Sequence, residues 1–477
     1  MKKMSRPAEE VFERARRRVA PLAERLEMAE RLEPYTPQMW DGSARPHPVL
    51  HFDDFSEIPF LVDITGVEEY QHRARLRVAP GDLFAAVTPP TPGYEDYCRQ
   101  RLGLGEVEFL LAEPVEGLMA VARACEEGAV WRRLVERTRE AGGLVIHPFM
   151  GIEPVWSLGR RLAAETGVDV PVVAPPPPAT WIANDKALFG EVVELTLGDG
   201  WLVETHRSAD VVSLAGHLLR LAEHHRRVAL KRLRCASAMG NVVFGAPELK
   251  AAGAAGVETL VLDFLVRTEW NGDEEVLAVA WEETDSSPST QMWIPPVGAG
   301  LPRLDGIYEQ ILESEHKVFI GSRPSGLPAA VNDKLAAASL EVAAALQALS
   351  YVGRCSFDFV VVSHQDDDCQ IRFTECNGRW GGTSTPMALL DRLVGLPRPP
   401  YRAQDLVHPR LVGASFTDLL DRVGEEAFNA RTGRGRFVFY NTGPLADFGK
   451  LDVIAKGGSR EEADAALEED LPRLLGL

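Results

Sequence analysis

Two carboxylates and an amide lie at strand spacing in the most informative part of the sequence. Residues Ser356 to Val362 form an apolar run around Asp358, and a second run, Ile371 to Asn377, contains Glu375. Side chains alternate along a strand, so Glu375 and Asn377 share one face, and a hairpin places Asp358 beside them. Carboxylate and amide oxygens are the ligands that Mg²⁺ prefers. The pattern therefore predicts a magnesium site.

A purely structural interpretation explains only part of this acidic pattern. The acidic turn Asp366 to Asp368 fits a solvated hairpin tip. The same reading works poorly for Glu375 and Asn377, because their apolar strand runs directly into the Gly-rich segment Gly378 to Ser384, which contains Arg379. We therefore interpret this end of the hairpin as a functional site.

A second candidate element is a strand that ends on a lysine. Arg227 to Lys231 is followed by a loop of small residues, Cys235 to Asn241, which includes Ser237 and Gly240. Small residues let backbone N–H groups approach a phosphate, and Lys231 supplies a positive charge. Many strands end in this way, so the pattern alone favours a structural reading.

The third candidate element is a lysine that begins a helical stretch. Lys186 follows Asn184 and Asp185 and precedes the helical run Ala187 to Val193. A cation at a helix N-terminus has no stabilising role of its own. A surface lysine and a ligand-binding lysine are both compatible with this position, and the first is commoner.

The fourth element is the apolar run Leu260 to Val266, followed by Glu269. As a strand leading into a linker, Leu262, Asp263 and Leu265 would offer backbone groups to a base, and Glu269 could bind ribose hydroxyls. A core strand is an equally good interpretation.

These elements must be positioned by several domains, because 477 residues exceed the size of one hydrophobic core. Residues 1–40 read as a helical segment, most simply an extension of the domain that follows. In residues 41–180, short strands at 60–62, 83–87, 107–111 and 143–149 alternate with a helical stretch at 117–141, which predicts a parallel α/β domain. The proline run 175–178 cannot continue a strand or a helix and marks a boundary.

The remainder of the chain divides near residue 400. Residues 181–400 carry all four chemical elements and the clearest helix, from about Asp333 to Leu349. Residues 401–477 contain a helix after Phe416, strands at 436–440 and 451–455, and an acidic helix from Ser459, which predicts a small α+β domain.

Composition excludes several classes of protein. The formal net charge of −19 argues against a nucleic-acid surface, which needs clustered Lys and Arg. No apolar run approaches the roughly 20 residues of a membrane span, so no membrane partner is expected. The 6 scattered cysteines form no CxxC pair, which favours a reducing compartment and a cytoplasmic protein. A homodimer is a common state for such enzymes.

Together, the order of these elements resembles the ATP-grasp superfamily from Trp181 to Pro400. The most specific part, Glu375-x-Asn377-x-Arg379-x-Gly381-Gly382, is similar to the E-x-N-x-R-x-G-G motif of that family. The resemblance implies a two-lobed ATP-grasp fold with ATP and Mg²⁺ as cofactors. It further implies that Lys186 and Lys231 bind the ATP phosphates and that Asp358, Glu375 and Asn377 bind the metal. Arg379 would stabilise the transferring phosphoryl group, Leu262 to Leu265 would form a hinge that binds adenine, and Glu269 would bind ribose.

The segments before and after this region resemble a more specific group within the superfamily. The domain before the proline run resembles a Rossmann-like pre-ATP-grasp domain, and the tail, with Gly443-Pro444-Leu445 and Gly449-Lys450, is similar to that of pheganomycin-type peptide ligases. This implies a carboxylate–amine ligase that forms an amide or peptide bond through an acyl phosphate, on amino-acid or peptide substrates. Arg323 is a candidate for binding a substrate carboxylate. An ATP-grasp carboxylase, a non-catalytic nucleotide-binding regulator and a scaffold are the alternatives.

Overall fold

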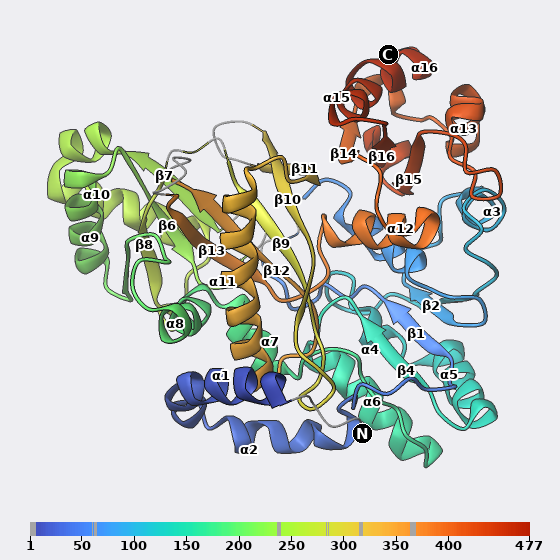
Figure 1. The fold of residues 1–477 in the computed structure, drawn as a ribbon, viewed down its shortest axis with the longest axis horizontal. Helices are drawn as coiled ribbons and strands as arrows, with labels where there is room; N and C mark the ends of the chain where they lie inside the picture. Colours follow the sequence, from blue (N-terminus) through green and yellow to red (C-terminus); the bar gives the residue numbers. More distant parts are fainter. Residues whose placement is uncertain are drawn as a thin grey trace.

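We describe the protein from a computed structural model (Figure 1). The structure describes residues 6–59, 61, 64–235, 240–282, 284, 286–313, 318–362 and 369–477. Three sheets organise this part of the chain.

The first sheet is parallel, with strand order β3-β2-β1-β4. Strands β1, β2 and β4 are mostly buried and apolar, as expected for a parallel sheet covered on both faces, whereas the edge strand β3 is more exposed. They are β1 (Val49–Phe52), β2 (Leu83–Ala86), β3 (Glu108–Leu111) and β4 (Val145–Pro148), joined by η2 (Val67–Leu76), α3 (Tyr94–Asp96), η3 (Tyr97–Arg101), α4 (Val121–Ala124), α5 (Gly128–Ala141) and α6 (Glu153–Thr166). The predicted parallel α/β fold is confirmed, although Phe60 and Val62 of the first expected strand lie outside the described residues.

The second sheet is antiparallel, with order β5-β8-β6-β7, and two helices pack on one of its faces (Figure 1). Its elements are β5 (Thr205–Ser208), α9 (Val211–His224), β6 (Arg227–Arg232), β7 (Asn241–Gly245), α10 (Ala246–Arg267) and β8 (Val276–Ala280). This sheet and its helices form one lobe around the site.

The third sheet has eight strands in the order β13-β12-β9-β10-β11-β14-β16-β15. Helices α8 (Lys186–Leu197) and α11 (Ala329–Ala348) pack against its first strands. Those strands are β9 (Pro288–Ile294), β10 (Arg303–Glu313), β11 (Val318–Pro324), β12 (Gly353–Val361) and β13 (Ile371–Asn377), and α12 (Ser384–Val394) follows them. The expected hairpin of β12 and β13 and the helix at α11 are both confirmed.

The C-terminal residues continue this sheet instead of forming a separate one, because β14 pairs with β11. The α+β content predicted for the tail is confirmed by β14 (Tyr401–Val407), η4 (Pro409–Leu411), α13 (Phe416–Val423), η5 (Gly424–Glu426), β15 (Phe437–Asn441), α14 (Leu445–Phe448), β16 (Lys450–Lys456), α15 (Arg460–Ala465), η6 (Ala466–Asp470) and α16 (Leu471–Leu475). Their core also includes Tyr94 and Tyr97 of the first domain.

The sequence suggested that the N-terminal helix α1 (Arg6–Arg25) extends the first domain, but the helix packs elsewhere. Its buried residues Val19 and Leu22 share a core with Leu335 and Val342 of α11. The short α2 (Met28–Leu32) and η1 (Glu33–Gln38) lead from there into the parallel sheet. An amphipathic pattern reveals that a helix has an apolar face, but not which distant element covers it.

The proline run also differs from its prediction. Pro177 and Pro178 begin helix α7 (Pro177–Asn184). Proline is tolerated in the first turn of a helix, where its missing N–H would have no partner within the helix. The run therefore starts the helix that leads to Lys186.

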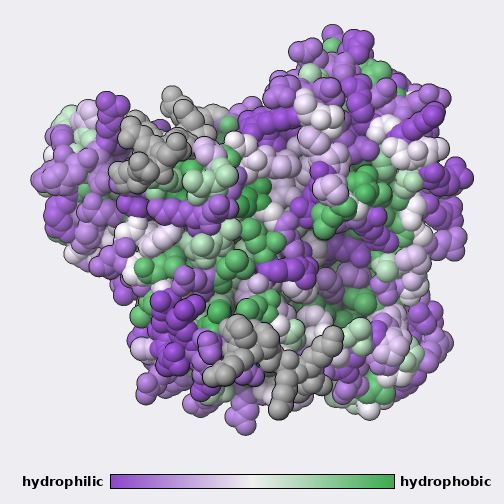
Figure 2. Space-filling model, in the orientation of Figure 1, coloured by the Kyte–Doolittle hydropathy of each residue, from purple (hydrophilic) through white to green (hydrophobic). Residues whose placement is uncertain are grey.

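The outer surface reflects the acidic composition. Figure 2 shows mostly hydrophilic residues along the edges of this face, with hydrophobic residues gathered toward its middle. Within the described ranges, no helix has both the length and the apolar character needed to cross a bilayer.

Candidate active site

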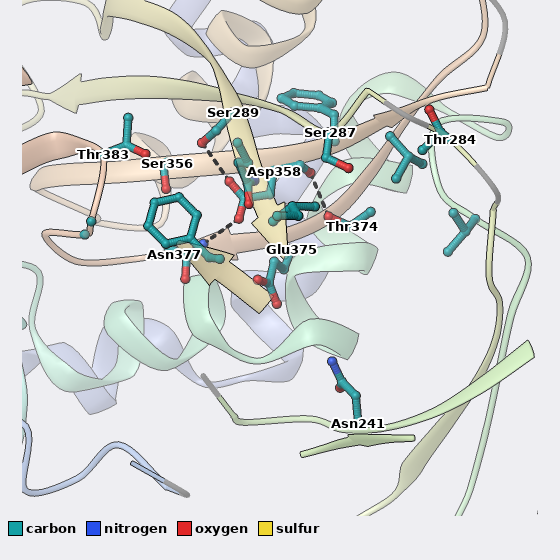
Figure 3. Close-up of a pocket in the computed structure, with 18 of the residues that line it drawn as sticks. Asn241, Thr284, Ser287, Ser289, Ser356, Asp358, Thr374, Glu375, Asn377 and Thr383 are labelled. Atoms are coloured by element: carbon teal, nitrogen blue, oxygen red, sulfur yellow. Dashed lines mark hydrogen bonds between the residues drawn. The ribbon is translucent and has the colours of Figure 1, made fainter. Parts of the chain in front are cut away.

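A cavity of about 280 Å³ lies between the two antiparallel sheets. One wall comes from β6, β7 and the end of β8, and the other from β9, β10, β12 and β13. Figure 3 shows Asp358, Glu375 and Asn377 gathered on one side, with Asn241 of β7 facing them across the open space. The residues that the sequence assigned to metal binding therefore meet at one cavity.

Strand register brings these three residues together. Asp358 pairs with Glu375 and Ser356 pairs with Asn377 across β12 and β13. On the other side of β12, Asp358 pairs with Ser289 of β9. The predicted convergence of the two carboxylates and the amide is confirmed, and β9 adds a hydroxyl.

Asp358 is held by two neutral donors. The Ser289 hydroxyl donates to Asp358 Oδ1 at 2.7 Å, and Asn377 Nδ2 donates to Oδ2 at 2.9 Å. Burial, followed by the nearby charge of Glu375, raises the pKa of Asp358 to about 7. Arg379 lies near both carboxylates and favours their charged forms, but the pKa of Asp358 is still raised, and a divalent ion would stabilise such a pair.

Glu375 has a different partner. Its Oε2 lies 3.1 Å from Lys186 Nζ. Burial alone would raise the pKa of Glu375, but the positive charges of Lys186 and Lys231 outweigh it, and the net shift is downward. Glu375 is therefore held ionised between the lysines and Asp358.

The set fits magnesium better than a metal that needs many protein ligands. Within the described ranges, no group of three or more His, Cys, Asp or Glu side chains could hold a metal ion. Magnesium commonly binds one or two carboxylates and completes its octahedron with water and substrate phosphates. Asp358, Glu375 and the amide of Asn377 match that requirement.

The two lysines lie on different elements: Lys231 lines this cavity, whereas Lys186 lines a smaller pocket that also includes Glu375. Lys231 projects from β6, with Nζ 5.2 Å from the centre of the Trp281 ring, and burial lowers its pKa. Lys186 begins α8, where Asp185 caps the helix and Cys235 Sγ lies 3.3 Å from Lys186 Nζ. Both lysines lie close enough to Glu375 to influence its ionisation.

The small-residue loop is only partly described. Ser237 lies outside the described residues. The Gly240 carbonyl accepts from the Arg232 N–H at 2.9 Å, so Gly240 closes the turn from β6 into β7, and the next residue, Asn241, lines the cavity.

Arg379 is half-buried at the cavity and is held by an asparagine to which the sequence assigned no role. Asn184 Oδ1, at the end of α7, accepts from Arg379 Nη1 and from the Gly378 N–H, both at 3.0 Å. A Cβ at Gly378 would lie 2.5 Å from Asn184 Nδ2, so only glycine permits this approach. Burial lowers the pKa of Arg379.

The predicted hinge at Leu262 to Leu265 is wrong. These residues lie in helix α10, where Val261 and Leu265 face the core while Leu262 and Asp263 are exposed. Short apolar runs do not distinguish a strand from a buried helix, and here the i, i+4 spacing belonged to a helix of 22 residues. Glu269 follows that helix and does not line the cavity.

The segment after β8 lines the cavity instead. Ala280, Trp281, Glu282 and Thr284 lie there, and Val203 faces them. This segment could not be recognised from the sequence, because β8 is a short buried strand with no distinctive motif.

Arg323, the other candidate ligand, is committed elsewhere. Its Nη1 lies 2.7 Å from Asp464 Oδ2, and its Nε lies 3.4 Å from Glu309 Oε2. It joins β11 to the C-terminal helix α15 and does not line the cavity.

Further polar residues from β9 and β10 were missed: Ser287, Ser289, Gln291 and Gln310. The alternation Ser287-x-Ser289-x-Gln291 is a usable signal, because it places polar side chains on one face of an otherwise buried strand.

Comparison with known proteins shows the fold. No model of a known protein family matches the sequence, and no curated protein matches it either. Among solved structures, an N5-carboxyaminoimidazole synthase from Aspergillus clavatus, in complex with ADP and 5-aminoimidazole ribonucleotide, has a TM-score of 0.54 at 12% identity, covering 92% of this chain and 100% of its own.

Two further structures show the same likeness. The N5-carboxyaminoimidazole synthetase of Staphylococcus aureus, complexed with ADP, has a TM-score of 0.53 at 11% identity over 91% of this chain and 99% of its own. The biotin carboxylase domain of the Hydrogenobacter thermophilus 2-oxoglutarate carboxylase, with MgADP and bicarbonate, has a TM-score of 0.51 at 14% identity over 90% of this chain and 92% of its own. The chain thus has the ATP-grasp fold that the sequence predicted.

Proposed function

We propose that this protein is an ATP- and Mg²⁺-dependent ligase that phosphorylates a carboxylate and joins the resulting acyl group to an amine. The observation that carries this proposal is the convergence of Asp358, Glu375 and Asn377 with Lys231 and Arg379 on one cavity. The similar folds of proteins solved with ADP or MgADP support a nucleotide in this cavity.

The nucleotide end of the cavity is the part next to β8. There the Ala280 and Trp281 N–H groups already donate to backbone carbonyls, so the backbone of Glu282 is the part that can pair with a base, and the Glu282 carboxylate can accept hydrogen bonds from ribose hydroxyls. Lys231 and Lys186 then lie toward the phosphates, where two positive charges offset the phosphate oxygens. Asp358, Glu375 and Asn377 would hold Mg²⁺, which neutralises charge on the transferring phosphoryl group when bound.

The proposed chemistry has two steps. A carboxylate oxygen attacks the γ-phosphorus, the bond to the β-phosphate oxygen breaks, and ADP leaves. The amine nitrogen then attacks the acyl carbon, losing a proton, and inorganic phosphate leaves. Arg379, fixed by Asn184, is placed to stabilise the negative charge of both steps without reorganising.

The finer assignment concerns the two substrates. The resemblance of the C-terminal segment to pheganomycin-type peptide ligases supports an amino acid or peptide as the amine. The second candidate function is carboxylation, with bicarbonate as the activated acid, and it is favoured by the likeness to a biotin carboxylase domain solved with bicarbonate.

A trapping experiment distinguishes these functions. The purified protein is incubated with ATP, MgCl₂, hydroxylamine and a pool of carboxylic acids, because hydroxylamine converts an acyl phosphate into a stable hydroxamate. We expect ADP and hydroxamate in equal amounts, both lost in Glu375→Ala and retained in Lys250→Ala, a change at an exposed lysine of the other lobe.

Three other results have different meanings. ADP formation that depends on bicarbonate and gives no hydroxamate favours the carboxylase. Nucleotide binding without turnover by any acid favours a regulator. Failure to bind ATP or ADP in the presence of Mg²⁺ contradicts the proposal altogether.

A further inference from the structure

The cavity-facing side of three strands carries six polar residues in two parallel rows. The first row contains Ser289, Asp358 and Glu375, paired across β9, β12 and β13. The second row is Gln291, Ser356 and Asn377, also paired across the same strands. Each member lies two residues from its counterpart, so the rows are about 7 Å apart. Metal binding accounts for the first row and Asn377, and Gln291 Nε2 donates to the Ser289 hydroxyl at 3.2 Å, which leaves the Gln291 carbonyl oxygen and the Ser356 hydroxyl without an assigned role.

The cavity continues beyond the metal ligands to the second row. Its walls there are Thr383 and the glycines before it, with Leu312 and Phe319 from β10 and β11. The ring of Phe319 lies against Gly382, because a Cβ at that position would be 2.6 Å from Phe319 Cε1. An aromatic wall thus faces a polar floor.

Among the residues that the structure describes, this end has no charged side chain beyond Arg379. The charged side chains among the described residues that line the cavity are Lys231, Glu282, Asp358, Glu375 and Arg379. All five already serve the nucleotide, the metal or the reacting carboxylate. A charged substrate group placed at the second row would lose its hydration and find no counter-ion among them.

A third row closes this end of the polar face. Arg354 pairs with Trp293, and its guanidinium lies 5.5 Å from the Trp293 ring and 5.4 Å from the Trp380 ring. Arg354 Nη1 is neutralised by Asp305 Oδ2 at 2.6 Å. Because this arginine is packed and paired, it terminates the polar face and offers no charge to a ligand.

The hydroxyls of Ser356 and Thr383 are available to a ligand. These residues are only 8% and 6% exposed, and both line the cavity. Among the described residues, neither hydroxyl has a hydrogen-bond partner. A purely apolar substrate would leave them unpaired, whereas a hydroxyl or carboxamide would satisfy them.

We propose that Gln291, Ser356 and Thr383 determine the acyl substrate, a small carboxylic acid with an uncharged hydroxyl or carboxamide group one row from the metal ligands. This inference rests on the proposed function and deepens it. The carboxylate lies at Arg379 and the metal, the neutral polar group reaches Ser356 and Gln291, and the intervening carbons contact Phe319 and Leu312.

The test uses the hydroxamate assay with three acids of similar size: L-glutamine, L-glutamate and L-methionine. A second set is L-threonine, L-aspartate and L-valine. In at least one set, we expect kcat/KM for the neutral polar acid to exceed both others by about tenfold or more, the ordinary value of one buried hydrogen bond.

Variants then assign the preference to the second row. Ser356→Ala should reduce the advantage of the polar acid over the apolar one by about tenfold, without changing the affinity for ADP. Ser356→Thr, which keeps the hydroxyl, should retain the preference, and Ser213→Ala, a surface serine of the other lobe, should change nothing.

The outcomes separate this inference from the proposed function. The proposed specificity is contradicted, and the ligase function is left intact, if a charged or apolar acid gives the most hydroxamate or if none of the neutral polar acids gives any. An unchanged preference in Ser356→Ala has the same meaning. If no acid in the panel or the larger pool gives hydroxamate, the proposed function itself fails, and the inference fails with it.

Discussion

Two regions of this molecule bury charged residues, and they do so in opposite ways. At the carboxyl end of β1 in the first domain, Arg77 pairs with the buried Asp53. Nearby, burial lowers the pKa of His147 to about 3, so that this side chain is neutral. Burial also raises the pKa of Asp53 and of the neighbouring Asp54, but other groups of the protein donate hydrogen bonds to both carboxylates.

The cavity between the antiparallel sheets is arranged differently. The pKa of Asp358 is raised and that of Lys231 is lowered, so burial opposes the charged form of each. Their side chains face an open volume instead of one another. Charged side chains that burial destabilises and that converge on a cavity indicate a ligand that would stabilise them. Charged side chains that pair with one another indicate a structural role.

The two regions meet at Trp380. The Arg77 guanidinium lies 4.7 Å from the centre of its ring, and the Trp380 N–H donates to the Phe149 carbonyl at 3.0 Å. Trp380 follows Arg379 directly, so the Arg77–Asp53 pair of the first domain supports the backbone next to Arg379.

Removing Arg379 should have the largest effect on activity. We expect Arg379→Ala to lower ATP-dependent turnover by about 1000-fold, because it deletes a preorganised positive charge where negative charge develops. The midpoint of thermal unfolding should not fall, since burial already disfavours this charge. Hydroxamate formation and differential scanning calorimetry measure the two quantities. A lower unfolding midpoint with retained activity would show that Arg379, like Arg77, has a structural role.

Removing Arg77 should reverse that pattern. Breaking a buried ion pair from one side leaves an uncompensated charge and costs about 3–5 kcal/mol. Arg77→Met should therefore lower the unfolding midpoint sharply, and adding Asp53→Leu should restore most of it. If Arg77→Met leaves the midpoint unchanged, the comparison between the two regions is wrong.

Lys231 should have an intermediate effect. Lys231→Ala is expected to weaken ATP binding by about 10- to 100-fold, the value of a charged hydrogen bond to phosphate. Titration calorimetry with ATP and Mg²⁺ measures this change, with Lys250→Ala as the matched control. Equal affinities for the two variants would exclude Lys231 from the phosphate site.

The smallest predicted effect concerns Glu69, in η2 of the first domain. Burial, then the charges of Glu68 and Asp447, raise its pKa from 4.5 to about 7. Between these values the folded protein retains a proton that the unfolded chain releases, so stability falls as pH rises through this window.

A neutral replacement should remove that pH dependence. We expect Glu69→Gln to raise the unfolding midpoint by about 1–2 °C at pH 8, and to have no stabilising effect at pH 4, where Glu69 is protonated in both states. Thermal unfolding followed by circular dichroism checks this. An equal rise at both pH values would point to packing instead of ionisation.

The sequence predicted those parts of the site that depend on local pattern. Alternation in two apolar strands was enough to place Asp358, Glu375 and Asn377 together, because the hairpin brings its strands into register. The two lysines were noticed at strand and helix ends, but only the family resemblance suggested that they bind phosphate, and that role stays a prediction. The first domain was found from its alternating strands and helices.

What the sequence could not predict depends on distant pairing. Ser289 and Gln291 join the site only because β9 pairs with β12 across about 70 intervening residues, and no local pattern specifies that partner. Leu262 to Leu265 was misassigned because a buried helix and a strand share the same composition. The docking of α1 on α11 is also non-local. The domain limits, the homodimer and the cytoplasmic location stay predictions.

The central claim is that a carboxylate oxygen attacks the γ-phosphate of ATP. Incubating the protein with ATP, Mg²⁺, an amine and a carboxylic acid labelled with ¹⁸O in its carboxyl group tests it directly. Mass spectrometry of the released inorganic phosphate should show one ¹⁸O atom per amide formed. Unlabelled phosphate, or label in AMP, would contradict activation through an acyl phosphate.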